Sequence, residues 1–125
     1  MSPDTILDTV DLSEFDVYDG DCVNIAVALK QIFGGTLVGA YANEVDFHDG
    51  LPAHVATEIN GTLYDGGGTT SRDALRERAH YGSRKQEWDD IIVTEIERPD
   101  RQLFDPEKTR EIKQNLIHQI HSQRR

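Results

Sequence analysis

The sequence predicts an α+β fold in which a buried helix packs on an antiparallel sheet. Residues 22–33 read CVNIAVALKQIF, and a helix that is apolar on most of its circumference is buried on most sides. Two strand-like runs, residues 53–59 and 62–65, flank Asn60-Gly61, which is the strongest short-range signal for a β-hairpin. A helix followed by an antiparallel meander is typical of the α+β class.

Further strands are expected on both sides of this hairpin. Residues 36–42 read as a strand after a Gly-Gly stop, and residues 91–96 read as another strand. Residues 43–52 are polar and are expected to form a loop. The three consecutive glycines at 66–68 interrupt the strand pattern.

Two further helices are indicated by their first residues. Thr70, with Asp73 three residues later, can cap a short helix that runs to about His80. Asp105-Pro106 begins a final helix, with Asp at the cap and Pro in the first turn. The apolar residues of this final helix form one stripe, consisting of Ile112, Leu116, Ile117 and Ile120.

The length of 125 residues fits one domain. Within residues 1–125 we expect an acidic lead-in over residues 1–17 and a C-terminal helix over residues 105–125. A single Cys excludes an internal disulfide and fits a reducing compartment. The first ten residues lack the apolar core of a signal peptide, and no run approaches the roughly 20 apolar residues that span a bilayer. We therefore expect a soluble, cytoplasmic protein.

The formal net charge of −10 disfavours nucleic acids and anionic membranes as partners. A protein or peptide substrate or partner is expected instead. Many Asp and few Lys residues also fit a halophilic protein from a high-salt cytoplasm. An ordinary acidic protein explains the same composition equally well.

Cys22 follows the turn residues Gly20-Asp21 and begins the buried helix. A thiolate is the nucleophilic form of Cys, and the first turn of a helix stabilises that anion. The same backbone N–H groups can hold the oxyanion of an acyl intermediate. A buried and inert Cys is the alternative, and position alone does not decide between the two.

His54 and Asp65 are brought together by the predicted hairpin register. Across a two-residue turn, Ala56 faces Asp65, and alternation puts His54 on the same face as Ala56. Asp65 is then the diagonal neighbour of His54, where a carboxylate can orient an imidazole and stabilise its cation. A surface His–Asp contact is the alternative, but it leaves Cys22 unexplained.

The order of Cys at a helix start, His on a following strand and Asp on the next strand resembles papain-like and transglutaminase-like cysteine enzymes. Residues 54–58 and 63–65 resemble the His and Asp strands of transglutaminase-like domains. Gly20-Asp21-Cys22 resembles the nucleophile turn of papain-like cell-wall peptidases. The resemblance implies a papain-like core with Cys22 as nucleophile, His54 as base and Asp65 as orienting acid.

Two positions depart from these families. Papain-like enzymes usually place a Gln or similar donor before the Cys, but residues 8–21 contain neither Gln nor Asn. Tyr18 is the remaining candidate for the oxyanion donor in this stretch. The Trp that often follows the His in transglutaminases is replaced by Ala56.

Two functions follow from the sequence. The first is a cysteine hydrolase of peptidase or amidase type that uses a Cys22–His54–Asp65 triad on an acyl or amide bond. The alternative is a catalytically silent binding or accessory module on the same fold, of a virus or phage type or one that docks a partner. The C-terminal helix could serve such docking or homo-oligomerisation.

The polar segment that precedes His54 contains residues of the types that bind metals. His48, His54 and the carboxylates of Glu44, Asp46 and Asp49 supply ligand types, but their spacing matches no specific metal pattern. A solvated loop explains the segment better. We therefore expect neither a metal nor an organic cofactor.

Overall fold

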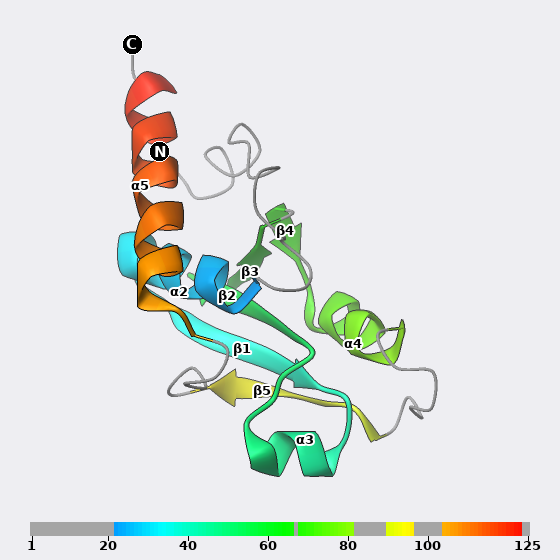
Figure 1. Cartoon of the computed structure of the whole chain (residues 1–125). Helices are drawn as coiled ribbons and strands as arrows, with labels where there is room; N and C mark the ends of the chain where they lie inside the picture. The colour runs from blue at the N-terminus through cyan, green and yellow to red at the C-terminus, as the bar shows by residue number, and fades with distance from the viewer. Residues whose placement is uncertain (1–21, 67, 82–89, 97–103, 124–125) are drawn as a thin grey trace.

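The computed structural model describes residues 22–66, 68–81, 90–96 and 104–123. The acidic lead-in, Tyr18 and the Gly20-Asp21 turn lie outside the described residues. Figure 1 shows the elements in chain order. They are α2 (Cys22–Phe33), β1 (Thr36–Tyr41), α3 (Glu44–Asp49), β2 (His54–Ile59), β3 (Thr62–Asp65), β4 (Gly68–Thr70), α4 (Arg72–Tyr81), β5 (Ile92–Ile96) and α5 (Pro106–Gln123).

The five strands form one antiparallel sheet in the order β4-β3-β2-β1-β5. The turn between β2 and β3 has positive φ at both central residues, 52° at Asn60 and 84° at Gly61. Positive φ at both positions is the requirement of a type I′ hairpin turn. The resulting register pairs Ile59 with Thr62 and Thr57 with Tyr64, which confirms the predicted hairpin.

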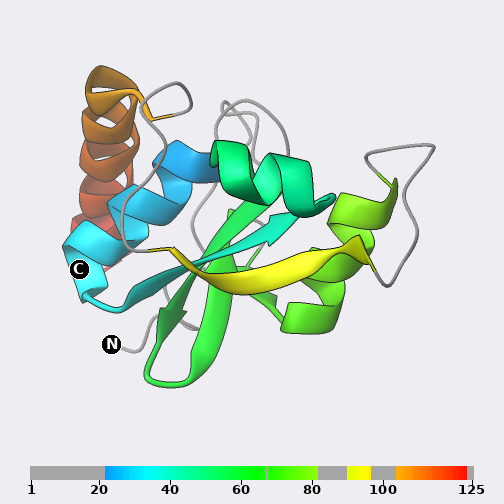
Figure 2. The ribbon, with the colours of Figure 1, turned by 90° about the horizontal axis from the view of Figure 1, so that it is seen from below.

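Helices cover both faces of the sheet, as Figure 2 shows, with α2 and α5 on one side and α4 on the other. Side chains alternate in direction along β2 and β3, so both strands contribute core residues to each face of the sheet. Towards α2 and α5, Ile59 and Tyr64 join a core cluster with Ile25, Ala28, Leu29, Ile112 and Leu116. Towards α4, Ala56 and Leu63 join a second cluster with Val38, Ala40, Leu75, Ala79 and Ile91. The α+β class and the packing of the Cys22 helix on an antiparallel sheet are therefore confirmed.

The predicted buried helix is α2, in which every residue from Cys22 to Leu29 is buried. The helix ends at Gly34, which has a φ of 81° and whose N–H donates to the carbonyl of Lys30 at 2.8 Å. A positive φ directly after a helix is the usual setting for a C-terminal glycine.

The expected loop over residues 43–52 is wrong, because its centre forms the short helix α3. The carboxamide oxygen of Asn43 accepts from the backbone N–H of Asp46 at 2.8 Å, and Gly50 ends the helix with a φ of 71°. Phe47 packs edge-on against Tyr41, with ring centroids 5.2 Å apart. Caps at both ends therefore stabilise this helix, although its polar sequence has no clear periodicity of apolar residues.

The expected Thr70 cap of the next helix is also wrong. Thr70 is the last residue of β4, an edge strand that the glycine run did not predict. The cap is Ser71, whose hydroxyl oxygen accepts from the backbone N–H of Ala74 at 3.0 Å.

The last helix, α5, begins as predicted. The carboxylate of Asp105 accepts from the backbone N–H groups of Glu107 and Lys108 at 3.0 and 3.3 Å. Three members of the expected stripe are buried, namely Ile112, Leu116 and Ile120. Ile117 is exposed, because it lies about 100° around the helix from Leu116. No helix in the described ranges is long and apolar enough to cross a membrane.

Candidate active site

His54 and Asp65 meet inside the protein at the end of the hairpin opposite its turn. His54 is the first residue of β2 and Asp65 is the last residue of β3. The ring Nε2 of His54 lies 2.9 Å from Oδ2 of Asp65. The exposed fractions of the two residues are only 1% and 7%. The predicted His–Asp contact is therefore present, and it is buried instead of lying on the surface.

Cys22 supplies the third group. It is the first residue of α2, its exposed fraction is 6%, and its electrostatic interaction with His54 raises the pKa of that ring. Cys22 packs in the cluster on the α2 side of the sheet with Val55, whereas Ala56 belongs to the cluster on the α4 side. The contact is therefore made at the end of the sheet, where β2 begins.

The protonation of His54 follows from these two partners. Burial alone would lower the pKa of His54, because it penalises the charged ring. The hydrogen bond to Asp65, together with the electrostatic interactions of His54 with Asp65 and Cys22, outweighs burial and raises the pKa of His54 from 6.5 to about 9. The ring is thus a cation at neutral pH, held between two acidic groups.

Thr57 fixes the strand of His54 to the helix of Cys22. Its side-chain hydroxyl donates to the backbone carbonyl of Ala26 at 2.6 Å, and Thr57 is fully buried. Ala26 lies one turn after Cys22, and Thr57 lies three residues after His54. The sequence does not indicate this role, since a Thr in a strand is common and its partner is 31 positions away.

Asn24 fixes the same helix to α5. Its carboxamide oxygen accepts from the backbone N–H of Asp105 at 2.8 Å and from the hydroxyl of Thr109 at 3.1 Å. Asn24 is buried two positions after Cys22. A polar residue within the otherwise apolar run 22–29 is the sequence signal that could have found it.

The other residues considered from the sequence do not join this site. His48 lies on α3 with its side chain exposed, 3.5 Å from Glu44. The described part of the chain contains no group of three metal-ligating side chains. Tyr18 lies outside the described residues, so its role as an oxyanion donor stays a prediction.

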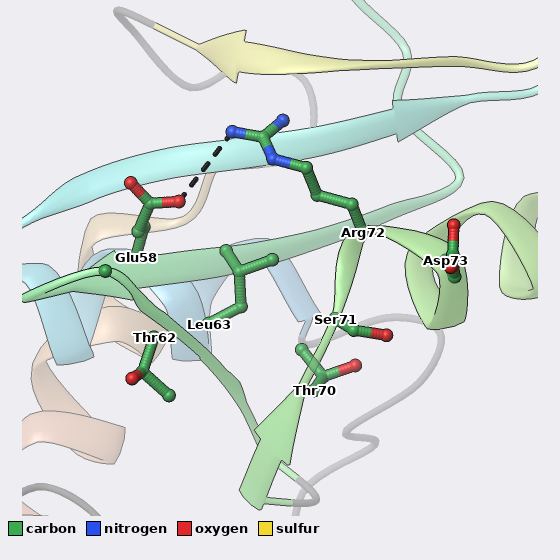
Figure 3. Close-up of a pocket in the computed structure, with 8 residues that line it drawn as sticks. Glu58, Thr62, Leu63, Thr70, Ser71, Arg72 and Asp73 are labelled. Carbon is green, nitrogen blue, oxygen red and sulfur yellow. Dashed lines mark ion pairs between the residues drawn. The ribbon is translucent and has the colours of Figure 1, made fainter.

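Three cavities that are lined by described residues lie away from Cys22, His54 and Asp65. One of about 400 Å³ lies beside the turn of the hairpin and the start of α4. Figure 3 shows Arg72 reaching across Leu63 towards Glu58, 3.7 Å away. Glu58 lies four residues after His54 on β2, which is about 13 Å along the strand. This cavity is therefore separate from His54. Neither this cavity nor the two others described is lined by Cys22, His54 or Asp65.

A comparison of the chain with protein families, curated proteins and solved structures finds no match. The interpretation of the site therefore depends on the geometry and chemistry of its own residues.

Proposed function

We propose that the chain is a papain-like or transglutaminase-like cysteine hydrolase that acts on acyl or amide bonds. The observation that supports this proposal is the His54 ring held between Asp65 and Cys22, with all three groups buried. A buried His that interacts with both an Asp and a Cys is hard to explain by packing, since a buried charge is unfavourable unless it is paired.

The proposed resting state is an imidazolium paired with a thiolate. Nε2 of His54 lies 2.9 Å from Asp65, and the buried Nδ1 is the ring nitrogen that we assign to Cys22 in the reaction. With the pKa of His54 near 9, both nitrogens carry hydrogen at neutral pH. One donates to the Asp65 carboxylate, and the charge of the ring balances the Cys22 thiolate of the proposed resting state.

The reaction then follows in two halves. The Cys22 sulfur attacks a carbonyl carbon, and the carbonyl π electrons move to its oxygen. The intermediate collapses to a thioester as His54 passes its proton to the departing amine or alcohol. Neutral His54 next takes a proton from water, the hydroxide attacks the thioester, and the carboxylic acid leaves as Cys22 and His54 regain their starting state. Asp65 keeps the ring oriented throughout.

The oxyanion requires hydrogen-bond donors that lie close to the sulfur. The first backbone N–H groups of a helix lack partners within it, and Cys22 is the first residue of α2. These groups are the proposed main donors. Tyr18 is the proposed side-chain donor, because it is the one residue of comparable reach in the segment just before Cys22.

The hydrolase is tested with p-nitrophenyl acetate, an activated ester that requires little substrate recognition. We expect an acetyl group on Cys22 by mass spectrometry, followed by turnover. Both steps should be lost in Cys22→Ser and His54→Ala, whereas Asp73→Asn on the exposed start of α4 serves as a carboxylate control. Ester hydrolysis that persists in Cys22→Ser would show that the thiol is not the nucleophile.

A second candidate function is a binding module on the same fold that has lost turnover. It is favoured by the 6% exposed fraction of Cys22. This module would accept an acetyl group on Cys22 slowly or not at all, and would release none. Association through α5 would have to use its outer face, where Ile117 is exposed.

A further inference from the structure

A separate hollow lies where the C-terminal part of α2 meets the beginning of α5. Its volume is about 260 Å³. Its walls combine two cations, an aromatic ring and an amide, supplied by Gln31, Phe104, Pro106, Thr109, Arg110 and Lys113. None of these residues belongs to the triad, so the hollow calls for its own explanation.

The two cations are the first unusual feature. Arg110 and Lys113 are three residues apart on α5 and therefore neighbours on one face. Neither forms an ion pair with a described residue, whereas Arg72 and Lys108 do. The chain has 23 acidic and 13 basic residues, so two neighbouring cations that pair with no carboxylate among the described residues are unusual for its composition.

Two of the three carboxylates nearby in sequence have other partners, and the third, Glu107, forms no ion pair with a described residue. Asp105 accepts from two backbone N–H groups as the cap of α5, and Glu111 pairs with Lys108 at 3.8 Å. Two like charges side by side on a helix repel each other. An anion bound between Arg110 and Lys113 would relieve this repulsion, and the fork of an Arg fits carboxylate and phosphate oxygens.

The other residues that line the hollow indicate which kind of molecule bears the anionic group. Phe104 is half-buried and packs against the core cluster that contains Cys22. With Pro106 it forms an apolar surface next to the cations. The hydroxyl of Thr109 is not available as a hydrogen-bond donor to a ligand, because it donates to Asn24. A hydrated inorganic ion would leave this apolar surface unused, whereas a flat ring would cover it.

We propose that this hollow binds a small aryl-bearing anion, with its charged group between Arg110 and Lys113 and its ring against Phe104 and Pro106. The charged group is a carboxylate or a phosphate monoester, which share the chemistry that the cations recognise. The site does not require the chemistry of Cys22, so a Cys22→Ser variant is expected to keep it.

The full chain is titrated with phenylacetate and with phenyl phosphate, and amide chemical shifts are followed by NMR. We expect saturable shifts at Gln31, Thr109 and Lys113 with either probe, and competition between the two. Tighter binding of one probe identifies the head group. Arg110→Gln and Lys113→Gln should each raise Kd about tenfold, as expected for loss of a charged hydrogen bond. Arg78→Gln, the same charge change on α4, should leave Kd unchanged.

Two ligand controls make the test independent of how the variants fold. Benzyl alcohol keeps the ring without the charge, and acetate keeps the charge without the ring, so both should bind far more weakly than phenylacetate. The proposal fails if neither aryl anion gives saturable shifts at these positions, or if acetate binds as tightly as phenylacetate. It also fails if the Arg110→Gln and Lys113→Gln variants bind as tightly as the wild type.

Discussion

At the scale of single residues, the defining feature is a buried histidine that keeps its proton. Burial favours the neutral ring, but contacts with Asp65 and Cys22 raise the pKa of His54 to about 9. Proton binding is therefore tighter in the folded chain than in the unfolded chain, where the ordinary pKa of 6.5 applies. This difference couples the protonation of His54 to stability.

The coupling predicts how stability depends on pH. The stability that His54 contributes is fully present below pH 6.5 and is lost as pH rises through about 9. The pKa difference corresponds to roughly 3 kcal/mol over this window. Urea unfolding of the wild type and of His54→Gln at pH 6 and pH 9 measures it. The difference between the two proteins should shrink at pH 9, and a difference that grows with pH would contradict the protonated state.

The sequence preference of two-residue hairpin turns predicted part of this site. The Asn60-Gly61 turn sets the register of β2 and β3, and this register brings His54 next to Asp65. The Cys22 contact required the packing of α2 at the end of the sheet, which no local pattern specifies. Thr57 and Asn24 were missed because their partners lie 31 and more than 80 positions away.

At the scale of elements, one hydrogen bond joins the two halves of the site. Thr57→Val removes the hydroxyl that donates to Ala26 but keeps the shape of the side chain. We expect a loss of about 1 kcal/mol in unfolding free energy and slower acylation of Cys22 at unchanged helix content. Thr57→Ser restores the hydroxyl and should recover most of the acylation rate. Equal rates in the Val and Ser variants would show that the bond does not position the site.

The connection between α2 and β1 offers a matched pair of glycines. Both have positive φ, 81° at Gly34 and 104° at Gly35. A Cβ at Gly34 would meet open space, whereas one at Gly35 would clash with the carbonyl oxygen of Glu58 on β2. Gly34→Ala should therefore destabilise by about 1 kcal/mol from backbone strain alone. Gly35→Ala should destabilise clearly more in the same urea titration, and equal losses would contradict the close approach.

Element prediction succeeded where a strong local pattern coincided with the tertiary structure. The apolar run of α2 and the hairpin residues are such patterns. It failed for α3 and β4, which have six and three residues. Helix α3 is held by its two caps and by Phe47 against Tyr41, and β4 is held by pairing with β3. Neither has a hydrophobic period that a sequence could display.

At the scale of the whole molecule, α5 belongs to the core. Its buried residues pack on α2, and Asn24 bonds its first turn. Leu116→Ala should therefore lower the unfolding free energy by about 2–5 kcal/mol, measured by urea unfolding. Ile117→Ala, one position along on the exposed face, should change it by less than about 0.5 kcal/mol. Similar values for both variants would mean that α5 does not pack as described.

The central claim is that His54 holds the Cys22 sulfur as a reactive thiolate. Because Cys22 is the single thiol of the chain, its alkylation by iodoacetamide can be measured without interference. We expect rapid alkylation already at pH 6 in the folded wild type, and a large decrease in that rate in His54→Ala. Alkylation at the rate of an ordinary thiol, with the same rate in His54→Ala, would contradict it.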